Sequence, residues 1–287
     1  MTTPPTSGPS DRQTAISRAL GVAAAFDADR EIAHRVAFLA NYLRAANKTS
    51  YVLGISGGVD SLVAGRLTQL AVERLRSEGY ACAFIAVRLP YGSQKDEQDA
   101  SRAMDFVAAD QRMTVDIKPA VDAQHAALVA AGLAYADAAA EDFVTGNIKA
   151  RQRMIAQYAI AGARNGLVVG TDHAAEALMG FFTKHGDGAA DVVPLNGLTK
   201  RRVRALGDAL GAPQDLVMKV PTADLETLRP LRPDEDAFGV TYTQIDAFLE
   251  GLSVPDQVAE VLLRQYDATQ HKRNPAAAPA PTPMQTT

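Results

Sequence analysis

The amino-acid sequence predicts an α/β protein built on a doubly wound parallel sheet with helices on both faces. Short apolar runs alternate along the chain with longer stretches of helical periodicity. Polar segments follow three of these runs directly, as expected at the carboxyl ends of parallel strands, where ligands bind. The chain has 287 residues, 47% of them hydrophobic and 22% charged, which is sufficient for one sizeable core.

The individual elements follow from these patterns. Apolar runs predict strands at 51–56, 81–89, 113–117 and 166–170. Helical spacing predicts helices at 11–27, 29–46, 60–77, 96–108, 119–131 and 140–163. The sequence beyond about residue 180 is rich in loops and short helices, which favours a region that covers a substrate over a second domain. Composition predicts disorder at 1–10 and in the Pro/Ala-rich tail at 274–287, on either side of a single domain at 11–273.

Composition also argues against several functional classes. The net charge of −4, with "TKRRVR" as the one basic block, disfavours a nucleic-acid binder. The chain has neither an apolar run of membrane-spanning length nor the apolar part of a secretory signal. Cys82 is the only cysteine, which excludes an intramolecular disulfide and a cysteine zinc cluster and fits a cytoplasmic setting. Because Cys82 lies in the apolar run "ACAFIAV", we expect a buried, inert thiol.

The stretch "LGISGGVDSLVAG" at 53–65 predicts an anion-binding turn between a strand and a helix. Free backbone N–H groups and the helix dipole would point at a phosphate there. The usual Gly-Lys-Ser/Thr ending is absent, and Ser56, Asp60 and Ser61 stand in its place. Asp60 would repel a phosphate unless a divalent cation such as Mg²⁺ lay between them. The plainer alternative is that Asp60 or Ser61 only caps the helix.

Other candidate residues follow later in the chain. Glu176 lies three residues after His173 on a predicted helix, so they share a face and Glu176 could be a second metal ligand. A core or capping role explains His173 at least as well as a catalytic one. Thr199 predicts a helix cap that puts Lys200 in the first turn, where a lysine opposes the helix dipole unless an anion is present. Thr222 in "VPTADL" offers a hydroxyl donor.

These motifs together resemble a known family. "SGGVDS" resembles the pyrophosphate loop of N-type ATP pyrophosphatases, which have an adenine nucleotide alpha hydrolase-like fold. Within that superfamily the chain is similar to ammonia-dependent NAD synthetase from about residue 29 to 274. The similarity lies in "RLPYGSQKDEQDA", "GNIKARQRM", "GTDHAAEALMGFFTKHGDGAADVVPLNGLTKR", "PTADL", "GVTYTQID" and "HKRNP". The chain departs from many members at Val59, at His185 and in its tail.

The resemblance implies an activity and a set of site residues. The activity is ATP-dependent amidation of deamido-NAD with ammonia, through an acyl-adenylate, to give NAD, AMP and pyrophosphate. The implied ATP contacts are Gly54, Ile55, Ser56, Gly57, Gly58, Val59, Asp60, Ser61, Arg88, Thr171, Lys200 and Thr222. The implied catalytic residues are Asp60, Lys200 and Thr222, and the implied magnesium ligands are Asp60 and Glu176. The implied deamido-NAD contacts are Arg151, Lys184, Asp191, His271 and Lys272.

The family resemblance also implies a homodimer and ammonia as the direct nitrogen donor. The candidate contact is the helix at 140–163, along which Ile148, Ile155 and Ile160 form an apolar stripe. Glutamine-using members carry an additional hydrolase domain with a reactive cysteine, and we expect neither in this chain.

Two other functions share part of the pattern. A different amide-forming or thiolating ATP pyrophosphatase would share "SGGVDS" but not "GTDHAAEA" or "HKRNP". A non-catalytic adenine-nucleotide sensor would have no need of the charged set Asp60, Glu176 and Lys200. Formation of AMP distinguishes an enzyme from the sensor, and formation of NAD together with AMP and pyrophosphate distinguishes amidation of deamido-NAD from the other reactions.

Overall fold

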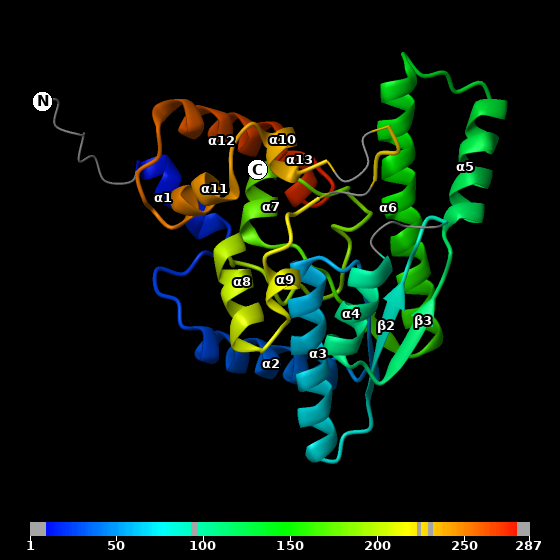
Figure 1. Ribbon diagram of the computed structural model, residues 1–287, viewed down its shortest axis with the longest axis vertical. Helices are drawn as coiled ribbons and strands as arrows, with labels where there is room; N and C mark the ends of the chain where they lie inside the picture. The colour runs from blue at the N-terminus through cyan, green and yellow to red at the C-terminus, as the bar shows by residue number, and fades with distance from the viewer. Residues whose placement is uncertain (1–9, 93–96, 223–224, 229–231, 280–287) are drawn as a thin grey trace, which may run out of the picture.

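The computed structural model describes residues 10–92, 97–222, 225–228 and 232–279 (Figure 1). Among these residues one parallel sheet has the strand order β3-β2-β1-β4. Its strands are β1 (Ser50–Gly54), β2 (Ala83–Arg88), β3 (Gln111–Thr114) and β4 (Gly166–Val168). In the register of the sheet, Tyr51 on β1 lies opposite Phe84 and Leu167. The strand order reverses between β1 and β4, and such a reversal opens a crevice at the carboxyl ends of the strands.

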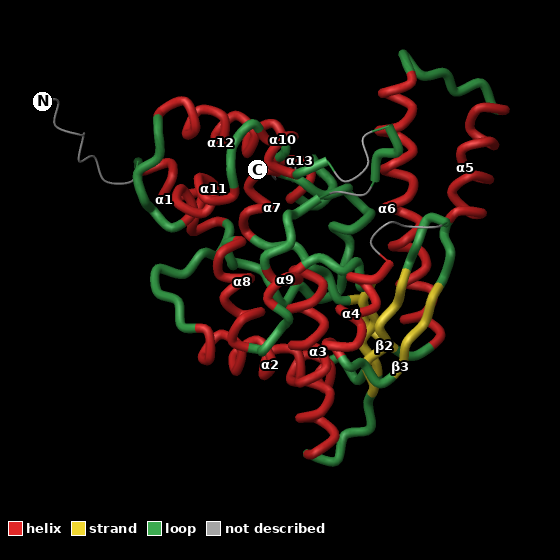
Figure 2. The backbone as a smooth tube through the Cα atoms, viewed as in Figure 1, coloured by secondary structure: helices red, strands yellow, loops and turns green. Residues whose placement is uncertain are grey.

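Helices cover both faces of the sheet, as the sequence predicts. On β1, Tyr51 and Leu53 are buried on one face, whereas Val52 is buried on the other. The first face packs against α2 (Ala28–Ala45), α3 (Val59–Ser77), α4 (Glu97–Val107), α8 (Lys200–Ala209) and α9 (Gln214–Val217). The second face packs against α5 (Lys118–Ala130) and α6 (Ala138–Ala163). Figure 2 shows α5 and α6 side by side, extending beyond the ends of the yellow strands.

A second hydrophobic cluster lies beside the sheet and joins the two ends of the chain. It contains α1 (Asp11–Ala19), α7 (Ala174–Met179), α11 (Tyr242–Leu249) and α12 (Asp256–Ala268), with α10 (Asp234–Phe238) and α13 (Gln270–Arg273) next to them. The side chains of Ile245 and Leu262 are fully buried in it. Gln13 on α1 donates to the carbonyls of Phe248 and Leu252 at 2.8 and 3.0 Å. The residues beyond about 180 are therefore more than the loop-rich, substrate-covering region that the sequence predicts, because their helices α11 and α12 form part of a hydrophobic cluster.

Several element boundaries differ from the sequence prediction for local reasons. Helix α1 ends at Ala19 rather than 27, because the chain turns at Gly21 with a φ of 72°. Strand β3 begins two residues early, after Ala108 ends α4 in a left-handed conformation. Cys82 precedes β2 instead of lying within it and is only partly buried, so that expectation was wrong. Burial still raises the pKa of the Cys82 thiol, which disfavours the reactive thiolate.

The structure tests the predicted disorder at the two ends of the chain only in part. Residues 1–9 and 280–287 lie outside the described residues, as does part of the segment "RLPYGSQKDEQDA" at 93–96. Residues 274–279 are exposed and form neither helix nor strand. Within the described part of the chain, none of the helices combines the length and apolar character required to cross a membrane.

Candidate functional site

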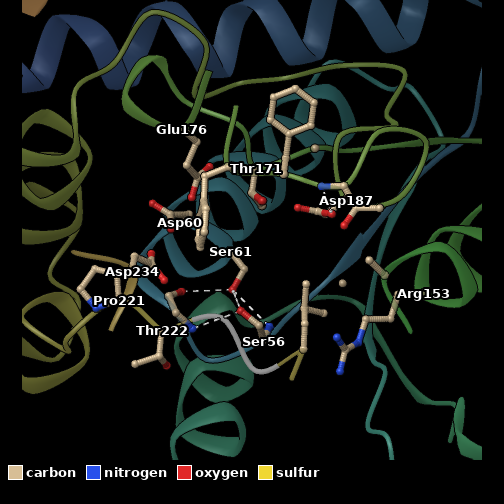
Figure 3. Close-up of a pocket in the computed structure, with 18 of the residues that line it drawn as sticks. Ser56, Asp60, Ser61, Arg153, Thr171, Glu176, Asp187, Pro221, Thr222 and Asp234 are labelled. Carbon is tan, nitrogen blue, oxygen red and sulfur yellow. Dashed lines mark hydrogen bonds between the residues drawn. The ribbon is translucent and has the colours of Figure 1, made fainter. Parts of the chain in front are cut away.

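A cavity of about 450 Å³ opens at the carboxyl ends of β1, β2 and β4 (Figure 3). It lies where the strand order reverses, as expected for a ligand site in an open α/β sheet. The predicted residues in its wall are Gly54, Ile55, Ser56, Gly58, Val59, Asp60, Ser61, Arg88, Thr171, Glu176, Lys200, Thr222 and Lys272. The cavity thus brings together segments that are far apart in the sequence.

The turn between β1 and α3 has the form of an anion site. Gly57 has a φ of 89°, and a Cβ there would lie 3.0 Å from the backbone nitrogen of Ala100, so a larger residue does not fit. The hydroxyl of Ser61 accepts from the backbone N–H of Ser56 at 3.2 Å, which folds the turn back on itself. The N-cap of α3 is Gly58, which provides no side-chain cap. Asp60 and Ser61 are therefore not the cap, and the first turn of α3 lines the cavity, as a helix N-terminus does where it binds an anion.

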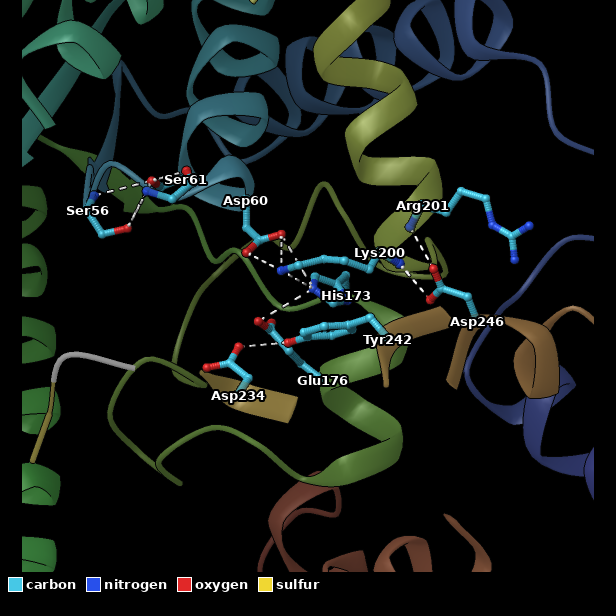
Figure 4. Close-up of polar contacts among 11 residues, drawn as sticks. Ser56, Asp60, Ser61, His173, Glu176, Lys200, Arg201, Asp234, Tyr242 and Asp246 are labelled. Carbon is cyan, nitrogen blue, oxygen red and sulfur yellow. Dashed lines mark hydrogen bonds and ion pairs between the residues drawn. The ribbon is translucent and has the colours of Figure 1, made fainter. Parts of the chain in front are cut away.

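A charged cluster lies next to this turn (Figure 4). The Lys200 ammonium is 2.8 and 3.0 Å from the two carboxylate oxygens of Asp60 and 3.2 Å from Nε2 of His173. Nε2 of His173 is also 3.5 Å from a carboxylate oxygen of Glu176. The Lys200 side chain is only 1% exposed, whereas Asp60 and Glu176 are 19% and 16% exposed. Lys200 is thus the most deeply buried of the three charged side chains, although it also contributes to the cavity wall.

Burial and mutual interaction set the charges in this cluster. Burial is the largest single influence on Asp60 and opposes its ionisation, but Lys200, His173 and the hydrogen bonds to the carboxylate together hold the pKa of Asp60 below its ordinary value. Burial also opposes the charge on Lys200, yet Asp60 and Glu176 raise the lysine's pKa. Burial, followed by the charge of Lys200, lowers the pKa of His173 to about 3, so the imidazole is neutral. It therefore interacts with Lys200 as a hydrogen-bond acceptor through Nε2.

The donor set fits a divalent cation. Ligand atoms of Asp60, His173 and Glu176 all lie within 4.8 Å of one another. Burial and the charge of Asp60 raise the pKa of Glu176 well above its ordinary value, which means that negative charge here is incompletely balanced. Burial and two nearby aspartates likewise raise the pKa of Asp172 to about 7. In nucleotide sites Mg²⁺ is bound by carboxylate and phosphate oxygens. The neutral imidazole of His173 is therefore not needed as a ligand.

Comparison with known proteins agrees with this architecture. The family described as NAD synthase matches residues 31–276 of the chain. An "NH(3)-dependent NAD(+) synthetase" of Burkholderia pseudomallei is 66% identical over 91% of this chain and 92% of the relative. This chain belongs to the NAD synthase family.

Two solved structures have folds similar to that of this NAD synthase family member. The crystal structure of NAD⁺ synthetase from Burkholderia pseudomallei has a TM-score of 0.81 and 63% identity, covering 94% of this chain and 99% of that one. The structure of NMN synthetase from Francisella tularensis has a TM-score of 0.77 and 33% identity, covering 89% and 99%. The adenine nucleotide alpha hydrolase-like fold predicted from the sequence is thereby confirmed.

Most of the residues predicted to contact deamido-NAD lie outside the cavity wall of this family member. Arg151 donates to the carbonyl of Lys184 at 3.2 Å, and the Lys184 ammonium donates to the carbonyl of His271 at 2.6 Å. These three form a continuous group beside the cavity. Asp191 accepts from the N–H of Val168 at 2.7 Å. Their substrate contacts remain predictions.

Lys272 is the one member of that set in the cavity wall. Its ammonium donates to the carbonyls of Gly180 and Phe182, both at 2.9 Å. Lys272 therefore joins α13 to the loop after α7, and burial lowers its pKa.

Sequence reasoning missed several wall residues on α6. Arg153 donates through Nε to the carbonyl of Leu89 at 3.0 Å, and Gln157 accepts from the N–H of Gly54 at 2.7 Å. A signal for them exists in the spacing of the α6 residues that line the cavity, which are Phe143, Gly146, Asn147, Ala150, Arg153 and Gln157. Arg151 is also on α6 but does not belong to this cavity-lining face. Asp187 and Asp234 also line the wall, and no local pattern singles them out.

Proposed function

We propose that this chain amidates deamido-NAD with ammonia, using ATP and releasing AMP and pyrophosphate through an acyl-adenylate. The observation that carries the proposal is the convergence of the Ser56–Ser61 turn with Asp60, Glu176 and Lys200 in one cavity. High identity to relatives named NH(3)-dependent NAD(+) synthetase supports the same reaction. ATP and ammonia are thus co-substrates, and NAD is the product.

The first step transfers adenylate to the nicotinate carboxylate. The carboxylate oxygen attacks the α-phosphorus of ATP, and the bond from that phosphorus to the bridging oxygen of pyrophosphate breaks. The turn at Ser56–Ser61 binds the departing pyrophosphate through hydroxyl and backbone N–H groups. Lys200 stays protonated because its acidic neighbours raise its pKa, so it neutralises charge that develops on the phosphates.

We assign magnesium ligation to Asp60 and Glu176. A magnesium ion held by these two carboxylates would neutralise charge on the phosphates of ATP. His173 keeps its neutral form between Lys200 and the acids and thus adds no positive charge to the cation site. Arg88, Thr171 and Thr222 line the same cavity and supply further donors to ATP.

The second step forms the amide. Ammonia attacks the acyl carbon of the adenylate, AMP leaves, and the nitrogen loses a proton. Activation comes from the adenylate itself, so a side-chain nucleophile is not required. The remaining work of the protein is to hold the two substrates in line and to keep water away.

We further propose that the active unit is a homodimer. The dinucleotide contacts assigned to Arg151, Lys184, Asp191 and His271 lie outside the cavity wall of a single chain. On helix α6, which carries Arg151, the residues Phe143 and Ile155 are 60% and 51% exposed. Ile148 and Ile160 pack inward against the sheet instead, so only Ile155 of the predicted stripe is available for the contact. A second copy over α6 would cover these apolar side chains and enclose the substrate.

Product analysis tests the reaction. The protein is incubated with ATP, Mg²⁺, ammonium chloride and deamido-NAD, or with nicotinic acid mononucleotide in its place. NAD, AMP and pyrophosphate in equal amounts are expected from deamido-NAD, with Asp60→Asn as the inactive control. At limiting total ammonium the rate should rise with pH, because only ammonia carries the attacking lone pair. ATP binding without AMP formation would instead identify a nucleotide sensor, and preference for the mononucleotide would identify an NMN synthetase.

A further inference from the structure

Helix α11 presents a line of polar side chains to the beginning of α8 (Figure 4). Tyr242, Asp246 and Glu250 are spaced four residues apart, which puts them on one face of the helix and its C-cap. Tyr242 and Asp246 are 3% and 2% exposed. None of them belongs to the cavity wall. Their contacts converge on Thr199 and Lys200, the N-cap and first residue of α8.

Asp246 holds the backbone at Lys200. One carboxylate oxygen accepts from the N–H of Lys200 at 3.0 Å, and the other accepts from the N–H of Arg201 at 2.8 Å. One turn further along α11, Glu250 accepts from the hydroxyl of Thr199 at 2.8 Å. The first N–H groups of α8 are thus satisfied by a different helix, in addition to the N-cap itself.

Tyr242 contacts the side-chain ammonium of Lys200. Its ring centroid is 4.9 Å from the Lys200 ammonium, a distance at which an aromatic face attracts a cation. The Tyr242 hydroxyl donates to Asp234 at 2.9 Å, and this bond orients the ring. The ammonium therefore has the tyrosine ring on one side and Asp60 on the other.

These contacts account for an oddity of the sequence. A lysine in the first turn of a helix opposes the helix dipole, and Lys200 is almost completely buried as well. The Asp246 carboxylate supplies the negative charge at the N-terminus of α8, while Asp60 supplies it at the ammonium. A lysine side chain has four rotatable carbon bonds, so fixing only its backbone would leave the ammonium mobile.

We propose that Asp246 and Tyr242 are positioning residues that hold the Lys200 ammonium at the phosphate site for adenylate formation. This proposal rests on the role assigned to Lys200 under the proposed function. The two residues do not touch substrate. They act through Lys200, Asp246 by locating its backbone and Tyr242 by limiting where its ammonium can lie.

The test separates the two chemical steps by quench-flow measurements at saturating substrates. Wild type, Asp246→Asn, Tyr242→Leu and Tyr242→Phe are compared for the rate of pyrophosphate formation and for the rate at which preformed adenylate reacts with ammonia. Misplacement of a charged group by about 1 Å can slow a step by up to about a hundredfold. We expect Asp246→Asn and Tyr242→Leu to slow pyrophosphate formation by about tenfold or more, with little change in the ammonia step.

Two controls distinguish positioning from loss of stability. Asp27→Asn removes an exposed aspartate that caps α2 by accepting from the N–H of Arg30 at 2.9 Å and that belongs neither to the cavity wall nor to the contacts of Lys200 described above. Leu249→Ala removes a buried apolar side chain from α11 itself. Both are measured at a temperature where every variant is folded by circular dichroism, and both should leave the rate of pyrophosphate formation within about twofold of wild type. Tyr242→Phe keeps the ring and should restore most of the rate that Tyr242→Leu loses.

The outcomes are distinct. The positioning role is overturned if Asp246→Asn and Tyr242→Leu match the two controls, or if they slow both chemical steps equally. A wild-type protein that forms no pyrophosphate with deamido-NAD would overturn the proposed function itself, which is a separate result from the behaviour of the variants.

Discussion

The Asp60–Lys200 pair permits a quantitative prediction for Asp60→Asn. The substitution keeps the shape of the side chain and removes the charge that faces an ammonium 2.8 Å away. Lys200 is 1% exposed in its side chain, so solvent replaces the lost partner poorly. Removing one member of a buried ion pair costs about 3–5 kcal/mol of unfolding free energy. Because Glu176 still attracts Lys200, we expect a loss near the lower end, about 3 kcal/mol.

Urea unfolding measures this loss without magnesium or nucleotide. With a dependence on urea of about 3 kcal/mol per molar, the unfolding midpoint of Asp60→Asn should fall by about 1 M. In a parallel assay its rate of AMP formation should fall by about a hundredfold or more, because the proposed magnesium ligand is lost.

A surface ion pair supplies the matched control. Asp215 accepts from Arg102 at 2.8 Å, but its side chain is 61% exposed. Asp215→Asn should therefore leave the urea midpoint and the rate of AMP formation nearly unchanged, since water screens and replaces such a pair. If Asp60→Asn unfolds at the same urea concentration as wild type, the reasoning about the buried ammonium is wrong. If it also turns over normally, the magnesium assignment is wrong as well.

Three further predictions follow from single side chains. Gly57→Ala should weaken ATP binding in calorimetry, because its Cβ would meet the backbone of Ala100 and a φ of 89° strains any side chain; unchanged affinity would contradict the tight turn. Cys82→Ala should retain ammonia-dependent turnover, and wild-type alkylation by iodoacetamide should accelerate as pH rises, because burial raises the thiol's pKa; rapid alkylation at neutral pH would show otherwise. Burial raises the pKa of Asp246 from 3.8 to about 6, with the nearby Glu250 adding to the rise, while the N–H groups of Arg201 and Lys200 and the charge of Arg201 oppose it. The folded state therefore binds this proton more tightly than the unfolded chain. Protonation of Asp246 thus contributes to the free energy of unfolding fully below pH 3.8, and this contribution is lost as pH rises through about 6. Asp246→Asn should remove that slope from a plot of unfolding free energy against pH, and an unaltered slope would assign it to other groups.

Local patterns in the sequence were sufficient for the sheet, its helices and the tight glycine turn between β1 and α3. A strand buried on both faces is a short apolar run, and an amphipathic helix repeats every 3.6 residues, so both are encoded within a few turns of chain. "SGGVDS" also carries its own geometry, because Gly57 must adopt a positive φ before the helix can begin. The carboxyl-end rule then placed Asp60, Thr171 and Glu176 at one edge without any structure.

The tertiary structure alone decided what surrounds Lys200. Its partners Asp60, His173, Tyr242 and Asp246 lie up to 140 residues from Lys200 along the chain. Each of these side chains has an ordinary local role, as a first-turn acid, a helix N-cap, an apolar aromatic or a polar helix position. Which of them meet depends on how α8 packs against α3 and α11, and that packing reflects the burial of whole helix faces. Periodicity determines which side of a helix is buried, but it does not specify the distant segment against which that side is buried.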